Sequence, residues 1–241
     1  ADTMTNSGIS LFFRRAQVQT GIILLTGMIL ALGMTGQAHA YAGILSSLTG
    51  GVSGTGNWLY TGPTTISWEV TQNGSGSWDY SYEFCHPRGE TSHFILEVSP
   101  TFSEDDIWCE HGDFEDVELG TWHVGGSNPN MPAPIYGLKF DDAEGLHTEI
   151  SFHSWRAPVW GDFYAKDGTA GGHGQNAAWN SGLTANDIDP QNAPSNGSVL
   201  NHILRPDTQT SVIHPVPEPG TFALLGLGLA GVAVVIRRKR G

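Results

Sequence analysis

Apolar and polar residues alternate along the middle of the chain, and this alternation predicts β-strands. Ile66, Trp68 and Val70 alternate with Ser67 and Glu69. The same two-residue period recurs over residues 78–84, 94–98, 136–140 and 150–152, and around Phe163. Aromatic and β-branched residues at every second position are typical of strands with one buried face. Because no long amphipathic helix pattern interrupts them, we expect a mainly β domain, an antiparallel β-sandwich or jelly-roll-like fold.

Turn-forming residues divide these segments and predict their connections. We expect residues 148–166 to form a hairpin that turns at residues 156–158. Segments 120–134 and 168–197 are rich in Gly, Asn and Pro, which predicts long loops. Residues 198–204 are predicted to form a closing strand, followed by a linker over residues 206–215.

The N-terminal segment has the pattern of a secretory signal peptide. Arg14 and Arg15 precede an apolar stretch over residues 21–34, and Ala38 and Ala40 form a small-x-small cleavage site. We therefore expect a signal peptide helix over residues 1–40, with signal peptidase as a partner. An uncleaved transmembrane anchor is the alternative.

The C-terminal segment predicts a transmembrane helix. An uncharged apolar run over residues 222–236 precedes a basic cluster over residues 237–240. Only a helix would satisfy the backbone of such a run inside lipid. Basic residues favour the cytoplasmic side, so everything before the run is expected outside. A plain single-pass anchor is the simplest interpretation of these two features.

A short motif before the apolar run adds a more specific interpretation. Pro217 and Pro219 bracket Glu218, which keeps this stretch extended and outside the helix. Motif, apolar run and basic end together resemble the PEP-CTERM sorting signal of Gram-negative bacteria. That resemblance implies processing by an exosortase, a membrane enzyme, and an association with extracellular polysaccharide and biofilm. It divides the chain into a signal peptide (1–40), an exported domain (41–215) and a sorting tail (216–241).

Charge and cysteine content narrow the choice of partners and compartment. The formal net charge of the 241-residue chain is −13, which argues against nucleic acid because phosphate binding needs a cationic face. Cys85 and Cys109 are the only cysteines, and in an exported domain an even count favours a disulfide between them. A metal pair or a catalytic thiol is the alternative.

No catalytic or metal-binding motif stands out in the exported domain. Acidic residues crowd residues 104–118, where calcium is an alternative to a solvated acidic face, but the EF-hand spacing is absent. The histidines are scattered without zinc-site spacing, so neither a metal nor another cofactor is expected. Trp155 and Trp160 are candidate glycan contacts, although a core position is the more common fate of a tryptophan.

These observations lead to a functional expectation. The domain is expected to be a non-enzymatic structural or adhesive protein of the cell surface or extracellular matrix, associated with matrix polysaccharide. A carbohydrate-binding module is one alternative, and a secreted glycosidase or lyase acting on exopolysaccharide is the other. Paired carboxylates for glycoside hydrolysis meet only in space, so the sequence leaves the second alternative open.

Overall fold

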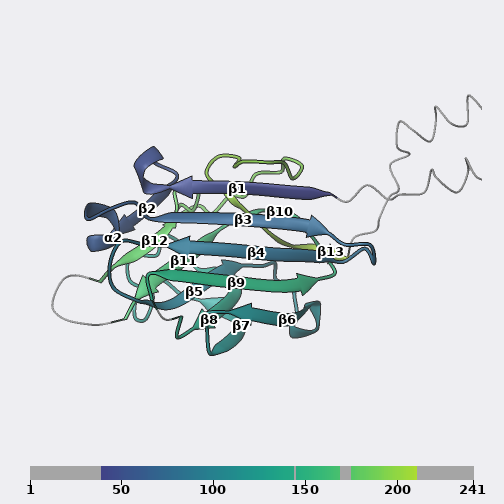
Figure 1. Ribbon diagram of the computed structural model, residues 1–241, viewed down its shortest axis with the longest axis horizontal. Helices are drawn as coiled ribbons and strands as arrows, with labels where there is room; N and C mark the ends of the chain where they lie inside the picture. The colour runs from purple at the N-terminus through teal and green to yellow at the C-terminus, as the bar shows by residue number, and fades with distance from the viewer. Residues whose placement is uncertain (1–38, 144, 169–174, 211–241) are drawn as a thin grey trace, which may run out of the picture.

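Two antiparallel β-sheets face one another in the computed structural model, which describes residues 39–143, 145–168 and 175–210 (Figure 1). The five-stranded sheet lies in front in Figure 1, in the order β1 (Ala40–Ser46), β3 (Thr65–Gln72), β4 (Trp78–Cys85), β9 (His147–Ser154) and β6 (Ile107–Gly112). All its neighbouring strands are antiparallel.

The six-stranded sheet lies behind it, in the order β2 (Val52–Thr55), β12 (Ala177–Asn180), β11 (Phe163–Asp167), β5 (Thr91–Glu97), β8 (Ile135–Asp141) and β7 (Asp116–Trp122). A separate two-stranded ribbon pairs β10 (Arg156–Gly161) with β13 (Ile203–Thr210). Helical structure in the described residues is limited to α2 (Asn57–Tyr60) and two 3-10 turns (Ser47–Thr49 and Glu104–Asp106).

An aromatic core joins the two sheets. The alternating apolar residues of β3 and β4 are all buried, as their period predicted. The ring of Phe84 in β4 lies 6.0 Å from that of Phe94 in β5 and 5.9 Å from that of Phe163 in β11. Phe152 of β9 and Phe140 of β8 make a further contact between the sheets, at 6.4 Å. The prediction of a mainly β, antiparallel domain is confirmed.

Loops cover the opposite face of the six-stranded sheet. Ile95 and Tyr164 point away from the main core and pack in a second buried cluster with Met131 and Leu183, which come from loops. This explains why β5 is buried on both faces. Most of the loop predicted over residues 120–134 is present, but β12 lies inside the segment predicted as a loop over residues 168–197.

The prediction of a hairpin over residues 148–166 was wrong. Strands β9, β10 and β11 follow one another in sequence, but they belong to three different sheets. The chain leaves the five-stranded sheet at Trp155, and β10 pairs with β13 instead of folding back on β9. Strand β13 also extends to Thr210, into the segment predicted as a linker.

The predicted disulfide is absent, because Cys85 and Cys109 are both free. Cys85 is paired with His147 at one end of β9, whereas Trp108, the neighbour of Cys109, is paired with His153 near the other end. Six residues of strand separate these positions, or roughly 20 Å. A disulfide needs Cα atoms within about 7 Å, so strand register excludes the bond.

The two terminal segments lie largely outside the described residues. This applies to Ala38, to the Pro217-Glu218-Pro219 motif and to the apolar run of the tail, whereas Ala40 opens β1. Among the residues that the structure describes, no helix is both long and apolar enough to cross a membrane.

Candidate functional site

Polar side chains form regular rows across the outer face of the five-stranded sheet. Residues directly opposite one another in antiparallel strands point to the same face. Strand register therefore aligns Thr71, Asp79, His153 and Trp108 in one row. The next row, on the same face, contains Glu69, Ser81, Ser151 and His111.

All residues of these two rows except Trp108 line a shallow groove with a volume of about 240 Å³. Cys109 also lines the groove. The remaining lining residues are Tyr80 and Phe152, whose side chains are buried in the core. A β-bulge between Trp108 and His111, where Cys109 has a φ of +54°, bends β6 beside the groove. Bulges of this kind re-aim side chains near binding sites.

Hydrogen bonds hold the floor of the groove in a fixed arrangement. His153 Nδ1 lies 2.6 Å from Asp79 Oδ1, and Asn73 Nδ2 donates to the same carboxylate oxygen at 3.1 Å. On the rim, Ser151 Oγ donates to the carbonyl of His111. The groove thus presents carboxylate, imidazole and hydroxyl groups that could bind the hydroxyls of a ligand.

Two indole rings lie at the end of this groove. Trp155 is 48% exposed, and its ring centroid is 5.0 Å from that of Trp108. Trp108 in turn lies 5.8 Å from His153, which lines the groove. Trp155 therefore remains accessible, as a glycan contact requires.

Trp160, the other candidate glycan contact, has no exposed surface, so that prediction was wrong. The ring lies in the main core, and its Nε1 donates to the carbonyl of Ala193 at 3.4 Å. The physical reason is the change of sheet at Trp155. Trp160 belongs to the β10–β13 ribbon, so the expected turn that would have exposed it does not exist.

The acidic run over residues 104–118 is not gathered into one loop. Part of it belongs to β6 in the five-stranded sheet and part to β7 in the six-stranded sheet. Asp106 is already paired with Arg156 at 2.8 Å, and hydrogen bonds from Arg156 and Ser103 help to lower the pKa of Asp106 against the effect of burial. Glu118 lies 3.7 Å from Lys139.

Two other groups of side chains in the described part of the chain are close enough to hold an ion. Glu83, Cys85 and His147 form one group near the surface, where His147 Nε2 lies 2.6 Å from Glu83 Oε1. Asp162, Asp189 and His202 form the other group, which is largely buried. Neither set was expected from the sequence.

Comparison of the chain with known protein families gives a match in the C-terminal tail. A family model described as the PEP-CTERM protein-sorting motif matches residues 215–239. This chain carries a PEP-CTERM sorting motif. The motif indicates an exported protein that is processed at the membrane by an exosortase, as the resemblance implied. No curated protein and no solved structure matches the chain.

The sequence did not predict that Trp108 packs against Trp155, nor that Asp162, Asp189 and His202 lie together. Trp108 joins Trp155 only through strand register, which no local pattern reveals. Asp162 did carry a signal, because it interrupts an otherwise apolar stretch over residues 159–165. A charged residue in such a stretch is costly to bury unless it is paired or binds an ion.

Proposed function

We propose that this PEP-CTERM protein is a non-enzymatic component of the cell surface or extracellular matrix that binds a glycan through its five-stranded sheet. The observation that carries the proposal is the groove on that sheet, with the exposed indole of Trp155 packed against the half-buried Trp108 beside it. Small-ligand sites combine a concave surface with a few polar groups that fix orientation. An exposed indole offers a flat apolar face on which a sugar ring can stack.

The charge of the groove limits which glycan is expected. Glu69 and Asp79 are the charged residues of its lining, apart from the histidines. Acidic groups repel an acidic polymer, so we expect a neutral glycan, or an acidic one bridged by cations. Export by the sorting system would bring the domain to a compartment where such polymers are present.

Binding can be measured on the full chain, purified in detergent, with neutral soluble polysaccharides and with exopolysaccharide from the native host. We expect Trp155→Ala to weaken binding about tenfold, which corresponds to about 1.4 kcal/mol. The control is Tyr60→Ala, because Tyr60 is an aromatic residue that is 81% exposed and lies on α2, away from the groove. This control should bind as the unmodified chain does.

Two outcomes would overturn the proposal. Equal affinities of the Trp155→Ala and Tyr60→Ala variants would remove the indole pair from the binding site. New reducing ends in a polysaccharide incubated with the chain would instead show glycosidase or lyase activity, for which carboxylates such as Glu69 and Asp79 would be the first residues to test.

A further inference from the structure

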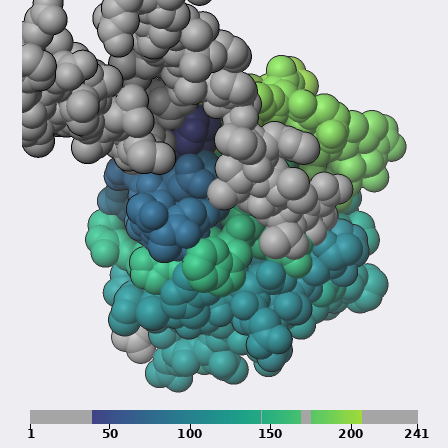
Figure 2. Space-filling view, turned by 90° about the vertical axis from the view of Figure 1, so that its right-hand side faces the viewer, coloured from purple at the N-terminus to yellow at the C-terminus, as the bar shows by residue number. Residues whose placement is uncertain are grey.

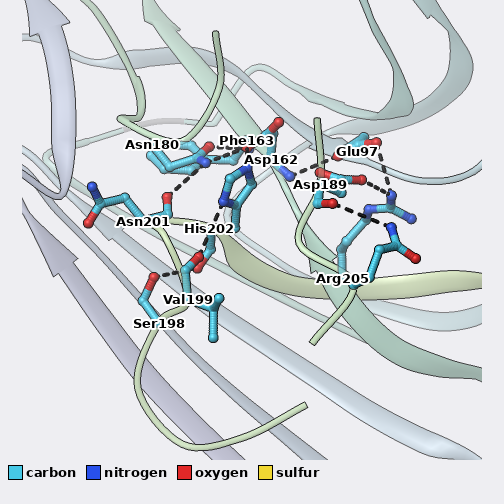
Figure 3. Close-up of polar contacts among 11 residues, drawn as sticks. Glu97, Asp162, Phe163, Asn180, Asp189, Ser198, Val199, Asn201, His202 and Arg205 are labelled. Carbon is cyan, nitrogen blue, oxygen red and sulfur yellow. Dashed lines mark hydrogen bonds and ion pairs between the residues drawn. The ribbon is translucent and has the colours of Figure 1, made fainter. Parts of the chain in front are cut away.

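A group of acidic residues lies buried where the β10–β13 ribbon meets the six-stranded sheet (Figure 3). Asp162 joins β10 to β11 and has no exposed surface. His202 immediately precedes β13 and is 3% exposed, and Asp189 comes from the segment between β12 and β13. This segment includes the yellow-green residues that project from the surface in Figure 2.

Each of these three side chains has a buried polar atom that makes no hydrogen bond within the described residues. The atoms are Asp162 Oδ2, Asp189 Oδ1 and His202 Nε2. Buried polar atoms are normally satisfied, so three without a partner in one cluster point to a ligand. One ligating atom of each residue lies within 4.8 Å of those of the other two.

The tautomer of His202 strengthens this conclusion. Its Nδ1 lies 3.2 Å from the carbonyl of Val199, and because a carbonyl only accepts, Nδ1 carries a proton. In the neutral ring, Nε2 therefore presents a lone pair, 3.5 Å from Asp162 Oδ1. A lone pair facing an ionised carboxylate is unfavourable unless a proton or a metal cation lies between them, and a metal can take the place of the proton. Metal-binding histidines commonly donate their other N–H to a backbone carbonyl in this way.

The charges around the cluster also call for a cation. Glu97, Asp162, Asp187 and Asp189 lie close enough together to influence one another electrostatically. Arg205 is the nearby strong base, and it binds Glu97 at 3.0 Å and Asp189 at 2.6 Å. With all four carboxylates ionised and His202 neutral, one guanidinium leaves a formal charge of −3, which protons on Glu97 and Asp162 reduce in the metal-free chain.

We propose that Asp162, Asp189 and His202 bind a divalent transition-metal ion such as Zn²⁺. Two ligands on a tetrahedral ion at about 2.1 Å are roughly 3.4 Å apart, close to the separation of His202 Nε2 and Asp162 Oδ1. An imidazole among the ligands favours transition metals over Ca²⁺, which prefers oxygen. The ion would tie the segment before β13 to the corner between β10 and β11.

Surrounding contacts hold the ligands in place for such an ion. Asn180 Nδ2 donates to Asp162 Oδ1 and to the carbonyl of Asn201, while its Oδ1 accepts from the backbone N–H of Phe163. The ring of His202 packs over Gly182, where a Cβ would lie 2.5 Å from Cε1. Both contacts fix side chains that would otherwise be free to turn away from the cluster.

Metal titration of the untagged full chain, stripped with a chelator, tests the proposal. We expect one Zn²⁺ per chain by calorimetry and a rise in melting temperature, since a ligand that binds only the folded state stabilises it. Ca²⁺ at the same concentration should give a much smaller rise. His202→Gln should weaken Zn²⁺ binding by at least about 100-fold, more than the loss of a residue that only orients a ligand.

His147→Gln is the matched control, because His147 belongs to the exposed group with Glu83 and Cys85. It should bind Zn²⁺ as the unmodified chain does. Asp189→Asn, at a partly exposed position, provides a second ligand variant if His202→Gln does not fold. The proposal is overturned if the unmodified chain binds no stoichiometric Zn²⁺, or if His147→Gln abolishes binding and the cluster variants retain it.

Discussion

Asp162 and Glu97 are the carboxyl groups whose ionisation is most altered by the fold. Burial raises the pKa of Asp162 to about 9 and that of Glu97 to about 8. Glu97 also lies between opposing influences, since Arg205 lowers its pKa while Asp187 and Asp189 raise it. Their carboxyl groups therefore hold protons in the metal-free folded chain at a pH where the unfolded chain has released them.

This difference predicts how the stability of the metal-free chain depends on pH. A group whose pKa is higher in the folded state contributes stability below its unfolded pKa, near 4, and loses it as the pH rises through the folded value. Burial lowers the pKa of His86 and His93 to about 4, which has the opposite effect below about pH 6.5. The melting temperature should therefore fall between about pH 7 and pH 9, which a thermal denaturation series would measure. Asp162→Asn, a neutral side chain of the same shape, should flatten the profile. A profile that rises with pH over this range would contradict the assignment.

Sequence reasoning at the residue scale succeeded where a local pattern decides burial. The two-residue period correctly placed Trp68 and Trp78 in the core. It failed for Trp160 and for the cysteines, whose surroundings depend on which strands become neighbours. The cluster of Asp162, Asp189 and His202 depends on the same long-range pairing and could not be assembled from sequence spacing.

Among the elements, the β10–β13 ribbon departs most from what the sequence predicted. It is joined to the five-stranded sheet by two tyrosine hydroxyls, because Tyr80 donates to the carbonyl of Arg156 at 2.8 Å and Tyr82 donates to that of Leu204 at 2.9 Å. The alternation of apolar and polar residues predicted the individual strands. It did not predict which strands pair, because an alternating strand can pair with the edge of any sheet, and packing of the whole core decides between the possible pairings.

Removing one of these hydroxyls tests the role of the ribbon contact. We expect Tyr82→Phe to lower the free energy of unfolding by about 1–2 kcal/mol, the usual effect of leaving a buried hydrogen-bond acceptor without its donor. Urea denaturation of the full chain measures this change. Tyr60→Phe removes a hydroxyl from an exposed side chain and should have almost no effect. Equal stabilities of the two variants would show that the Tyr82 contact does not stabilise the ribbon.

At the scale of the whole molecule, the chain combines a sorting tail with a β domain that has two separate candidate sites. The groove and its indole pair lie on the outer face of the five-stranded sheet, whereas the acidic cluster lies where the ribbon meets the six-stranded sheet. Because the two sites share no residue, glycan binding and metal binding can fail independently. A metal that stabilises the domain would serve an exported protein.

The sorting tail gives a prediction for the chain in its native host. From the sequence, Pro217 and Pro219 predict an extended segment around Glu218, which is the form that a processing enzyme can bind in its active site. Replacing Pro217, Glu218 and Pro219 with alanine removes both the fixed φ angles of the prolines and the carboxylate of Glu218. We expect an unprocessed precursor that stays in the membrane fraction, detected by immunoblot and by the intact mass of the protein.

Pro215→Ala is the control for this experiment, because it removes a proline two residues before the motif and leaves Pro217, Glu218 and Pro219 unchanged. This variant should be processed and released like the unmodified chain. If the triple variant is released with the mature mass, the motif is not what the processing enzyme recognises. The apolar run and basic end, which both variants retain, would then carry the signal.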